Sequence, residues 1–228
     1  MSNASAYASD IAFTNTVKAL QSQRGSRRAY GHMERNGSWE TRITPELARF
    51  IEMQTSVFLA TANLELQPYV QHRGGPPGFL KVLDERTIGF AEFAGNRQYI
   101  SHGNLADNPK AQIFLLDYAS RRRVKIWGSA RVIEDDAALV AKLMPTSYGI
   151  RADQAILFEV LVWDENCPRH IPQRLDTADV TAALAERDQR ITALEAELQR
   201  FREQAQDPQS QRRRPLTREA GDDFQADM

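Results

Sequence analysis

The sequence predicts a mainly β protein with peripheral helices, an α+β fold in which a six-stranded antiparallel split barrel precedes a C-terminal coiled-coil helix. Two observations support this prediction. Short apolar runs, separated by polar or glycine-containing turns, recur between residues 57 and 163, which is typical of antiparallel hairpins. After Leu175 apolar residues recur every seven positions, which indicates a helix with one narrow apolar face.

Residues 1–42 are expected to form an N-terminal helical extension. Within it, residues 11–23 predict a short surface helix, and residues 24–39 predict a basic, glycine-containing connector. Threonine, proline and glutamate at 44–46 then indicate a helix start, because a hydroxyl can cap free N–H groups and both proline and an acid suit the first turn. That helix opens the barrel domain, residues 43–174.

The barrel domain is expected to consist of hairpins with two further helices. Glycines and prolines at 74–78 predict a loop, and helices are predicted at 95–108, beginning near Gly95, and at 137–144. The strands are expected from these runs: 57–61, 68–73, 79–83, 87–91, 111–118, 123–134 and 155–163. A closed or split barrel of such strands leaves no free sheet edges.

Residues 175–204 are expected to form an amphipathic helix. Two apolar rows run along it, and their members are Leu184, Ile191 and Leu198 in one, and Val180, Leu194 and Phe201 in the other. Arg187 interrupts the second row. With the first row at heptad position a of a parallel dimer, Arg190 meets Glu195 of the second chain, and Glu197 likewise meets Arg202. This favours a short parallel coiled coil; a helix packed on its own barrel is the alternative.

Composition excludes several classes of protein. The 29 Lys and Arg residues balance 30 Asp and Glu residues, so we expect neither nucleic acid nor a membrane surface as partner. A single cysteine, Cys167, allows no internal disulfide and favours a cytoplasmic location. The polar residues 1–10 predict no signal peptide, and no run approaches the roughly 18 apolar residues of a membrane span. The polar residues 205–228 are expected to be disordered.

Two segments have the composition of a site for an anionic ligand. Gln71–Arg73 places three polar side chains before glycines, which let a backbone approach a ligand closely; an exposed hairpin loop is the alternative. Asn96, Arg97 and Gln98 lie at an expected helix start, where free N–H groups and the helix dipole favour phosphate. Arg97 can add a bidentate contact, and ordinary capping with a solvated arginine is the alternative.

A third segment predicts a cationic and aromatic strand face. Arg123, Lys125 and Trp127 alternate with apolar residues and therefore share one face, and Arg122 precedes them. A ligand or a dimer interface would account for this face, and a solvated strand is the alternative.

The order of these segments resembles the FMN-binding split barrel of the pyridoxamine 5'-phosphate oxidase-like proteins. The resemblance covers residues 43–172, and its motifs are Phe58–Ala62, Arg73–Phe79, Gly95–Gln98, Gly103–Leu105, Asn108–Pro109 and Lys125–Gly128. It implies an antiparallel split barrel, FMN as cofactor, oxidoreductase activity on a small molecule and a homodimer with the flavin at the subunit interface.

The resemblance also implies roles for the first two segments. Residues Gln71, His72 and Arg73 would contribute to the flavin site, and the segment Asn96–Gln98 would bind the FMN phosphate. The oxidase proper has an Arg-Lys pair where this chain has Arg97 and Gln98. One positive charge is therefore missing, and Arg73 or the partner subunit would supply another.

The third segment is implied to reach the neighbouring subunit's flavin. This assigns Arg122, Arg123, Lys125 and Trp127 to cofactor binding. Reduction develops negative charge on the pyrimidine end of the flavin, and a cation there, from Arg73 or Lys125, would stabilise the reduced anion.

Arg169 and His170 are expected to line the substrate pocket. The oxidase proper has an Arg-Leu-His segment near this place that contacts the substrate's phosphate, whereas Arg169 and His170 are adjacent here. A substrate other than pyridoxamine phosphate is therefore expected. Cys167 and His170 have the spacing of two metal ligands, but no second pair accompanies them, so no metal is predicted.

Three functions are consistent with these residues. The favoured one is an FMN-dependent oxidoreductase that transfers hydride through flavin N5. The second is a non-catalytic flavin- or haem-binding protein, for which His72, His102 and His170 are available. The third is a coiled-coil interaction protein with a degenerate barrel. Cofactor content separates the third from the others, and turnover separates the first from the second.

Overall fold

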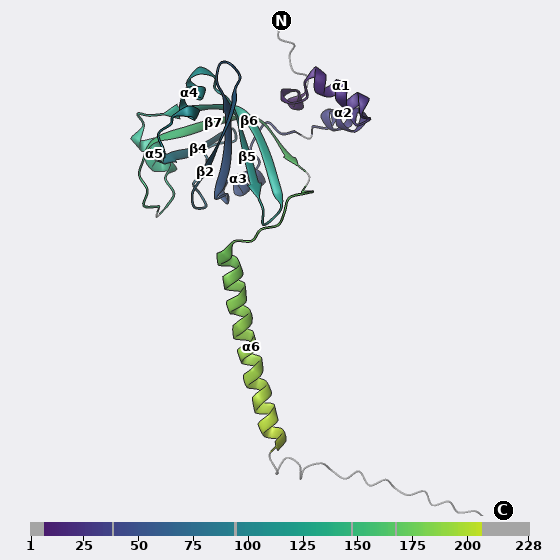
Figure 1. Ribbon diagram of the computed structural model, residues 1–228, viewed down its shortest axis with the longest axis vertical. Coiled ribbons are helices and arrows are strands. Elements are labelled where there is room, and N and C mark those ends of the chain that lie inside the picture. The colour runs from purple at the N-terminus through teal and green to yellow at the C-terminus, as the bar shows by residue number, and fades with distance from the viewer. Residues whose placement is uncertain (1–6, 38, 94, 147, 167, 207–228) are drawn as a thin grey trace, which may run out of the picture. The chain divides into compact units, whose positions relative to one another are not determined.

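The computed structural model describes residues 7–37, 39–93, 95–146, 148–166 and 168–206 (Figure 1). The chain divides into two compact units between Arg174 and Leu175. The first unit contains the sheet and its surrounding helices. The second contains the long helix α6 (Thr177–Gln206). The predicted disordered segment 205–228 lies outside the described residues from residue 207 onward.

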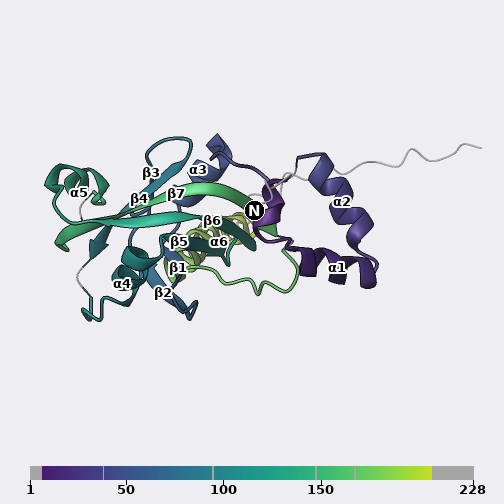
Figure 2. The same ribbon diagram turned by 90° about the horizontal axis from the view of Figure 1, so that it is seen from above.

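One antiparallel sheet forms the body of the first unit. Its strands are β1 (Ser56–Ala62), β2 (Pro68–Gly74), β3 (Lys81–Val82), β4 (Thr87–Phe93), β5 (Lys110–Asp117), β6 (Arg122–Ile133) and β7 (Ala152–Asn166). They are hydrogen-bonded in the order β2-β1-β5-β6-β7-β4-β3, and the sheet curves around its core (Figures 1 and 2). The predicted fold class, mainly β with peripheral helices, is confirmed.

The predicted barrel differs from the structure in two details. The described sheet has seven strands, one more than the six given for the barrel, and they correspond to the seven predicted runs, of which 79–83 forms only the short edge strand β3. The expectation that no sheet edge stays free also fails for the described residues, because β2 pairs only with β1 and β3 pairs only with β4. The barrel is therefore split between these two edge strands.

Alternating side chains build the core. On β1 and β5 every second residue is buried, and Leu59 and Ile113, which lie opposite each other, have no exposed surface. At the β6–β7 register shift a side chain on Gly128 would place its Cβ 2.0 Å from the carbonyl oxygen of Glu159. Only glycine permits this close approach of the two strands.

Short helices cover the barrel. α3 (Pro45–Glu52) begins as predicted, with the Leu47 backbone N–H donating to the Thr44 hydroxyl at 3.2 Å. It lies at the opposite end of the sheet from α4 (Ile100–Asp107) in Figure 1. α5 (Ala137–Leu143) is capped by Asp136, whose carboxylate accepts from the Leu139 N–H at 2.8 Å. None of the described helices is long and apolar enough to cross a membrane.

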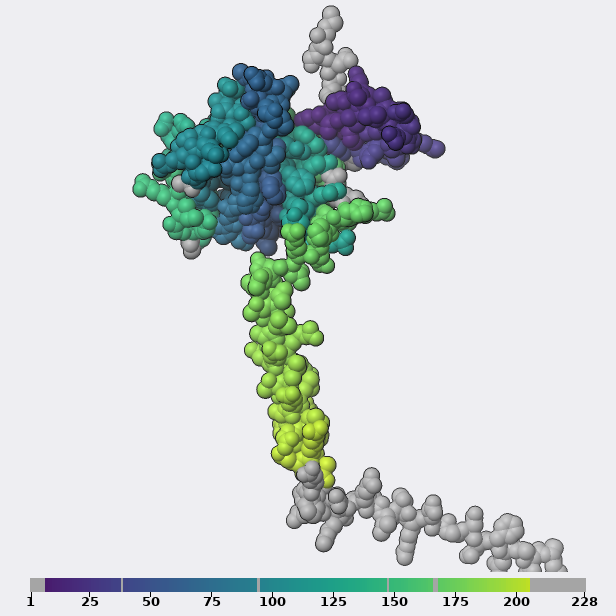
Figure 3. Space-filling model, in the orientation of Figure 1, coloured from purple at the N-terminus to yellow at the C-terminus, as the bar shows by residue number. Residues whose placement is uncertain are grey.

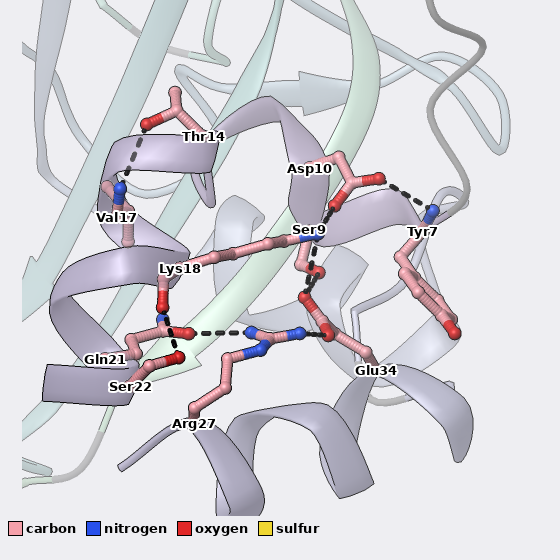
Figure 4. Close-up of polar contacts among 10 residues, drawn as sticks. All are labelled: Tyr7, Ser9, Asp10, Thr14, Val17, Lys18, Gln21, Ser22, Arg27 and Glu34. Carbon is pink, nitrogen blue, oxygen red and sulfur yellow. Dashed lines mark hydrogen bonds and ion pairs between the residues drawn. The ribbon is translucent and has the colours of Figure 1, made fainter. Parts of the chain in front are cut away.

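The N-terminal extension is more helical than predicted. It contains η1 (Ala8–Ile11), α1 (Asn15–Gln23) and α2 (Arg27–Arg35). The predicted connector is therefore wrong, because it contains α2. The buried Glu34 side chain of α2 pairs with Arg27 and with Lys18 at 3.5 Å and accepts from Ser9 at 3.4 Å (Figure 4). These long-range polar contacts stabilise a helix that lacks an apolar pattern.

The extension contacts the barrel through aromatic rings. Trp39 is buried and stacks on Trp127 of β6, with ring centroids 5.0 Å apart and an interplanar angle of 17°. The Phe13 ring also contacts Trp39, with ring centroids 5.2 Å apart. Glu40, which follows Trp39, exchanges backbone hydrogen bonds with Trp163 of β7. The chain's own N-terminal segment thus covers Trp127 on the outer face of β6.

Candidate functional site

A cavity of about 380 Å³ lies beside β2, in the size range of small-molecule sites. The end of β4, the loop before α4 and the start of β7 complete its walls. It brings together two of the three predicted segments, namely Gln71 and Arg73 from β2 and Asn96, Arg97 and Gln98 from the loop. We call it the β2 cavity.

Successive side chains of β2 point to opposite faces of the sheet. Gln71 and Arg73 alternate with His72, so the first two line the β2 cavity and His72 points to the other face. There the His72 ring lies 2.7 Å from the Ser56 hydroxyl and packs against Phe58. His72 borders a neighbouring cavity of about 290 Å³, which Arg73 also lines.

The loop 95–99 has an irregular backbone. Arg97 and Tyr99 have φ angles of 57° and 55°, in the left-handed region. The Gln98 N–H donates to the Asn96 side-chain oxygen at 3.2 Å. The prediction that α4 begins near Gly95 is therefore wrong, because the helix begins at Ile100. Left-handed residues alternating with other conformations turn successive N–H groups toward one side, which is a common anion-binding arrangement.

A half-buried ion pair forms one wall of the β2 cavity. An Nη2 atom of Arg73 lies 2.8 Å from Oε1 of Glu92, and the His102 Nε2 lies 3.9 Å from the same oxygen. Burial raises the pKa of Glu92, while the neighbouring Arg73 and His102 side chains oppose that rise. Arg73 is thus partly neutralised by an acid that the sequence-based prediction did not include.

Two further polar contacts hold this wall in place. The buried hydroxyl of Ser101 donates to the Gln71 side-chain oxygen at 2.7 Å, so the Gln71 amide group is oriented. One turn further along α4, Asn104 donates to the hydroxyl of Thr61 on β1 at 3.0 Å. Helix α4 is therefore fixed to both β2 and β1.

The third predicted segment lies elsewhere in this chain. Arg122 forms two hydrogen bonds with Glu165, at 2.9 and 2.7 Å, and an ion pair with Glu46 at 3.1 Å. The hydrogen bond with Glu165 raises the pKa of Arg122. Its guanidinium also lies 4.6 Å from the Phe50 ring centroid. Arg122 therefore joins β6, β7 and α3 in this subunit.

Lys125 and Trp127 are also occupied within the chain. Lys125 lies 3.2 Å from the Asp164 carboxylate and 5.2 Å from the Trp127 ring centroid. Burial raises the pKa of Asp164, and Lys125 opposes this rise. The Trp127 ring stacks on the Trp39 ring, as described above. Neither residue lines the β2 cavity.

Three other predicted residues are not brought to this cavity. Arg123 lies on the outer face of β6 and forms no ion pair with the described residues. Arg169 and His170 are exposed in the turn after β7 and do not line the β2 cavity. Cys167 lies outside the described residues. In the part of the chain that the structure describes, no three potential ligands gather as a metal site.

Sequence reasoning missed Glu92 and Ser101, and it named His102 only as a histidine available for haem. Glu92 is the charged residue in an otherwise apolar run over 88–93, which is a signal that could have identified it. Ser101 and His102 carry no comparable signal, because their positions depend on where α4 begins.

The fold defines an antiparallel split-barrel protein with a donor-rich cavity beside one edge strand. The family profile described as pyridoxamine 5'-phosphate oxidase matches residues 43–167, more than half of the chain. The chain therefore belongs to the pyridoxamine 5'-phosphate oxidase family, and the resemblance seen in the sequence is confirmed.

Three solved structures are similar at low sequence identity. The HupZ protein of Group A Streptococcus is 14% identical, with a TM-score of 0.45, over 58% of this chain and 99% of that chain. A putative pyridoxamine 5'-phosphate oxidase from Lactobacillus delbrueckii is 21% identical, with a TM-score of 0.40, over 54% and 98%. An FMN-binding protein from Syntrophomonas wolfei is 15% identical, with a TM-score of 0.41, over 65% and 97%. A comparison with curated protein sequences finds no match.

The residues of the β2 cavity fit a phosphorylated ligand. The Nε atom of Arg73 and the Oε2 atom of Glu92 are buried without a hydrogen-bond partner among the described residues. A buried polar atom without a partner is costly, so it indicates a group that a ligand or water satisfies. Arg97, the side-chain amides of the loop and Gln71 add further donors, and Arg97 forms no ion pair with another described residue.

Proposed function

We propose that the protein is an FMN-dependent oxidoreductase of this family and that the β2 cavity holds the FMN phosphate. The observation that carries this proposal is the meeting of β2 and the loop 95–99, two segments far apart in the sequence, around one cavity. Amide and guanidinium donors dominate its polar lining, and such donors suit an oxyanion.

Each donor has a distinct task in this proposal. Arg97 makes the charge-assisted contact with the phosphate, and the side-chain amides of Asn96 and Gln98 complete it. Gln71, oriented by Ser101, offers its amide N–H group to polar atoms of the ligand. The buried Nε of Arg73 gains the partner that it lacks among the described residues.

The chemistry depends on how these residues distribute charge. When bound, FMN supplies hydride transfer through its N5 atom. Arg73 stabilises nearby negative charge only as far as Glu92 does not neutralise it. A proton on Glu92 therefore increases the positive field of Arg73, and the raised pKa of Glu92 favours that proton.

A second subunit is part of the proposal. The outer face of the β1–β5–β6 sheet places Phe58 opposite Phe114, Phe114 opposite Lys125 and Leu116 opposite Arg123. This mixture of apolar side chains with a cation that has no ion pair among the described residues is suited to a protein–protein contact. Arg123 is then the residue of the third segment that is free to reach a partner's flavin.

Identification of the cofactor that co-purifies with the full chain tests the proposal. We expect a flavin absorption spectrum, release of FMN on heating and about one FMN per subunit. A haem spectrum without flavin would support the haem-binding alternative. A colourless protein that also binds no added FMN would contradict the proposal and leave the interaction protein as the better hypothesis.

A further inference from the structure

The apolar residues of α6 form a narrow row that is open to solvent. They occupy positions a and d of successive heptads, and the row, called the α6 seam below, consists of Val180, Leu184, Ile191, Leu194, Leu198 and Phe201. Their exposed fractions range from 38% at Val180 to 60% at Phe201. Figure 3 shows the side chains standing out along this helix, coloured green to yellow.

Charged residues flank the α6 seam on both sides. Arg190 and Glu197 occupy position g, and Glu195 and Arg202 occupy position e. An apolar stripe confined to a and d is typical of a coiled-coil contact, whereas a helix packed on a globular core has a wider stripe. None of these four residues forms an ion pair with another described residue. Their charges are therefore available to a partner.

We propose that α6 pairs in parallel and in register with α6 of a second copy of this chain. In that arrangement Arg190 faces Glu195 of the second copy, and Glu197 faces Arg202 of the second copy. Two-fold symmetry doubles each contact, so four opposite-charge pairs flank the seam and no like-charge pair does. This inference does not depend on the cofactor.

The antiparallel arrangement matches the charges less well. A register that places Leu184 opposite Phe201 of the second copy also places position g of one helix beside position g of the other. Arg190 then faces Glu197 favourably. However, position e faces position e, so Asp188 approaches Glu195, and like charges at such positions oppose pairing. The parallel arrangement is the one whose flanking charges all attract.

Arg187 is the exception within the seam. It occupies position d between Val180 and Leu194, where a parallel dimer brings the two arginines together. The long side chain can keep its charge in solvent while its stem covers apolar surface, but the layer remains weak. We expect Arg187→Leu to strengthen pairing, because it completes the apolar row.

Cysteine cross-linking of the full chain tests the proposal. Cys167, the single cysteine, is first replaced by serine, and Leu194→Cys then places one thiol at position d. Pairing raises the local thiol concentration from micromolar to millimolar, so cross-linking about tenfold or more faster than in the position f control Ala196→Cys is expected. Equal rates in the two variants would overturn the proposal. Circular dichroism verifies that both variants retain α6.

Charge reversal determines the direction of pairing. The double variant Arg190→Glu, Glu197→Arg places like charges at every parallel flank but keeps opposite charges between g positions in the antiparallel arrangement. We expect its Leu194→Cys cross-linking to fall several-fold. Mixing it with a chain carrying Glu195→Arg and Arg202→Glu should restore cross-linking between the two chains. Unchanged cross-linking of the double variant alone would contradict the parallel arrangement.

Discussion

Single residues decide what the β2 cavity can bind. The sequence identifies Arg97, Asn96 and Gln98 through their composition, and the structure places them in one cavity with Gln71 and Arg73. It could not identify Glu92 as a neighbour, because the pairing of Arg73 with Glu92 links two strands that do not hydrogen-bond to each other. Side-chain contacts across an open sheet edge depend on curvature, which local sequence does not specify.

Arg97 provides the first prediction at this scale. A charge-assisted hydrogen bond is worth about 1.5–3 kcal/mol, so Arg97→Ala should weaken FMN binding by about 10- to 100-fold. Fluorescence titration of cofactor-free protein measures the change. Arg28→Ala, which removes an exposed arginine from α2, is the matched control and should bind FMN like the unaltered chain. Equal loss in both variants would argue against a direct contact.

Glu92 provides a prediction about pH. Burial raises the pKa of Glu92, and a bound phosphate adds negative charge that raises it further, so binding takes up a proton. FMN affinity should therefore fall as pH rises through the pKa of Glu92 in the free protein. The other charged side chains that line the cavity are Arg73, Arg97, Arg151 and Asp153, and His102 also lines it.

Two variants separate the groups that contribute to this pH dependence. Glu92→Gln should remove the contribution of Glu92 to the dependence of FMN affinity on pH, while retaining the shape of the side chain. His102→Gln tests whether His102 contributes to the same dependence. Titration of FMN itself is common to all variants, so the difference between affinity–pH profiles is the measurement. A Glu92→Gln profile that is parallel to that of the unaltered chain would show that Glu92 does not titrate with binding.

Among the helices and strands, local sequence patterns correctly predicted the start of α3 and the alternating strands. The caps of α3 and the alternating strands follow from patterns within a few residues, and the structure confirms them. α2 was missed because a buried ion pair, rather than an apolar face, stabilises it. The start of α4 was misplaced because the left-handed residues Arg97 and Tyr99 delay the helix.

Glu34 should control the stability of the N-terminal extension. Its side chain is 1% exposed and contacts Lys18 and Arg27, so neutralising it removes both ion pairs. Breaking a buried pair costs about 3–5 kcal/mol. Glu34→Gln should therefore accelerate amide hydrogen exchange in α1 and α2. Glu40→Gln makes the same chemical change at an exposed residue and should have little effect.

Gly128 tests the close approach of β6 and β7. An alanine Cβ would lie 2.0 Å from the Glu159 carbonyl oxygen, so the strands would have to separate. Gly128→Ala should lower the free energy of unfolding by about 1–3 kcal/mol or more in chemical denaturation. Gly103→Ala is the control, because its Cβ meets no atom within 4 Å and alanine favours the helix. Similar stability of both variants would contradict this account.

At the level of the whole molecule, both the barrel and α6 are proposed to contact a second copy of the chain. If the second subunit completes the flavin site, FMN retention should depend on protein concentration, because dilution separates the subunits. Parallel measurements of sedimentation and bound FMN over a dilution series test this. FMN loss at concentrations where the dimer persists would show that the partner does not contribute to the site.

The affinity of the cofactor-free protein for FMN, compared with its affinity for riboflavin, tests the proposed phosphate site. The two flavins differ only in the phosphate that the loop 95–99 is proposed to hold. We predict that FMN binds about 100-fold more tightly, which corresponds to about 2.7 kcal/mol of phosphate recognition. Equal affinities would contradict a phosphate site in the β2 cavity, and failure to bind either flavin would contradict the flavoprotein assignment itself.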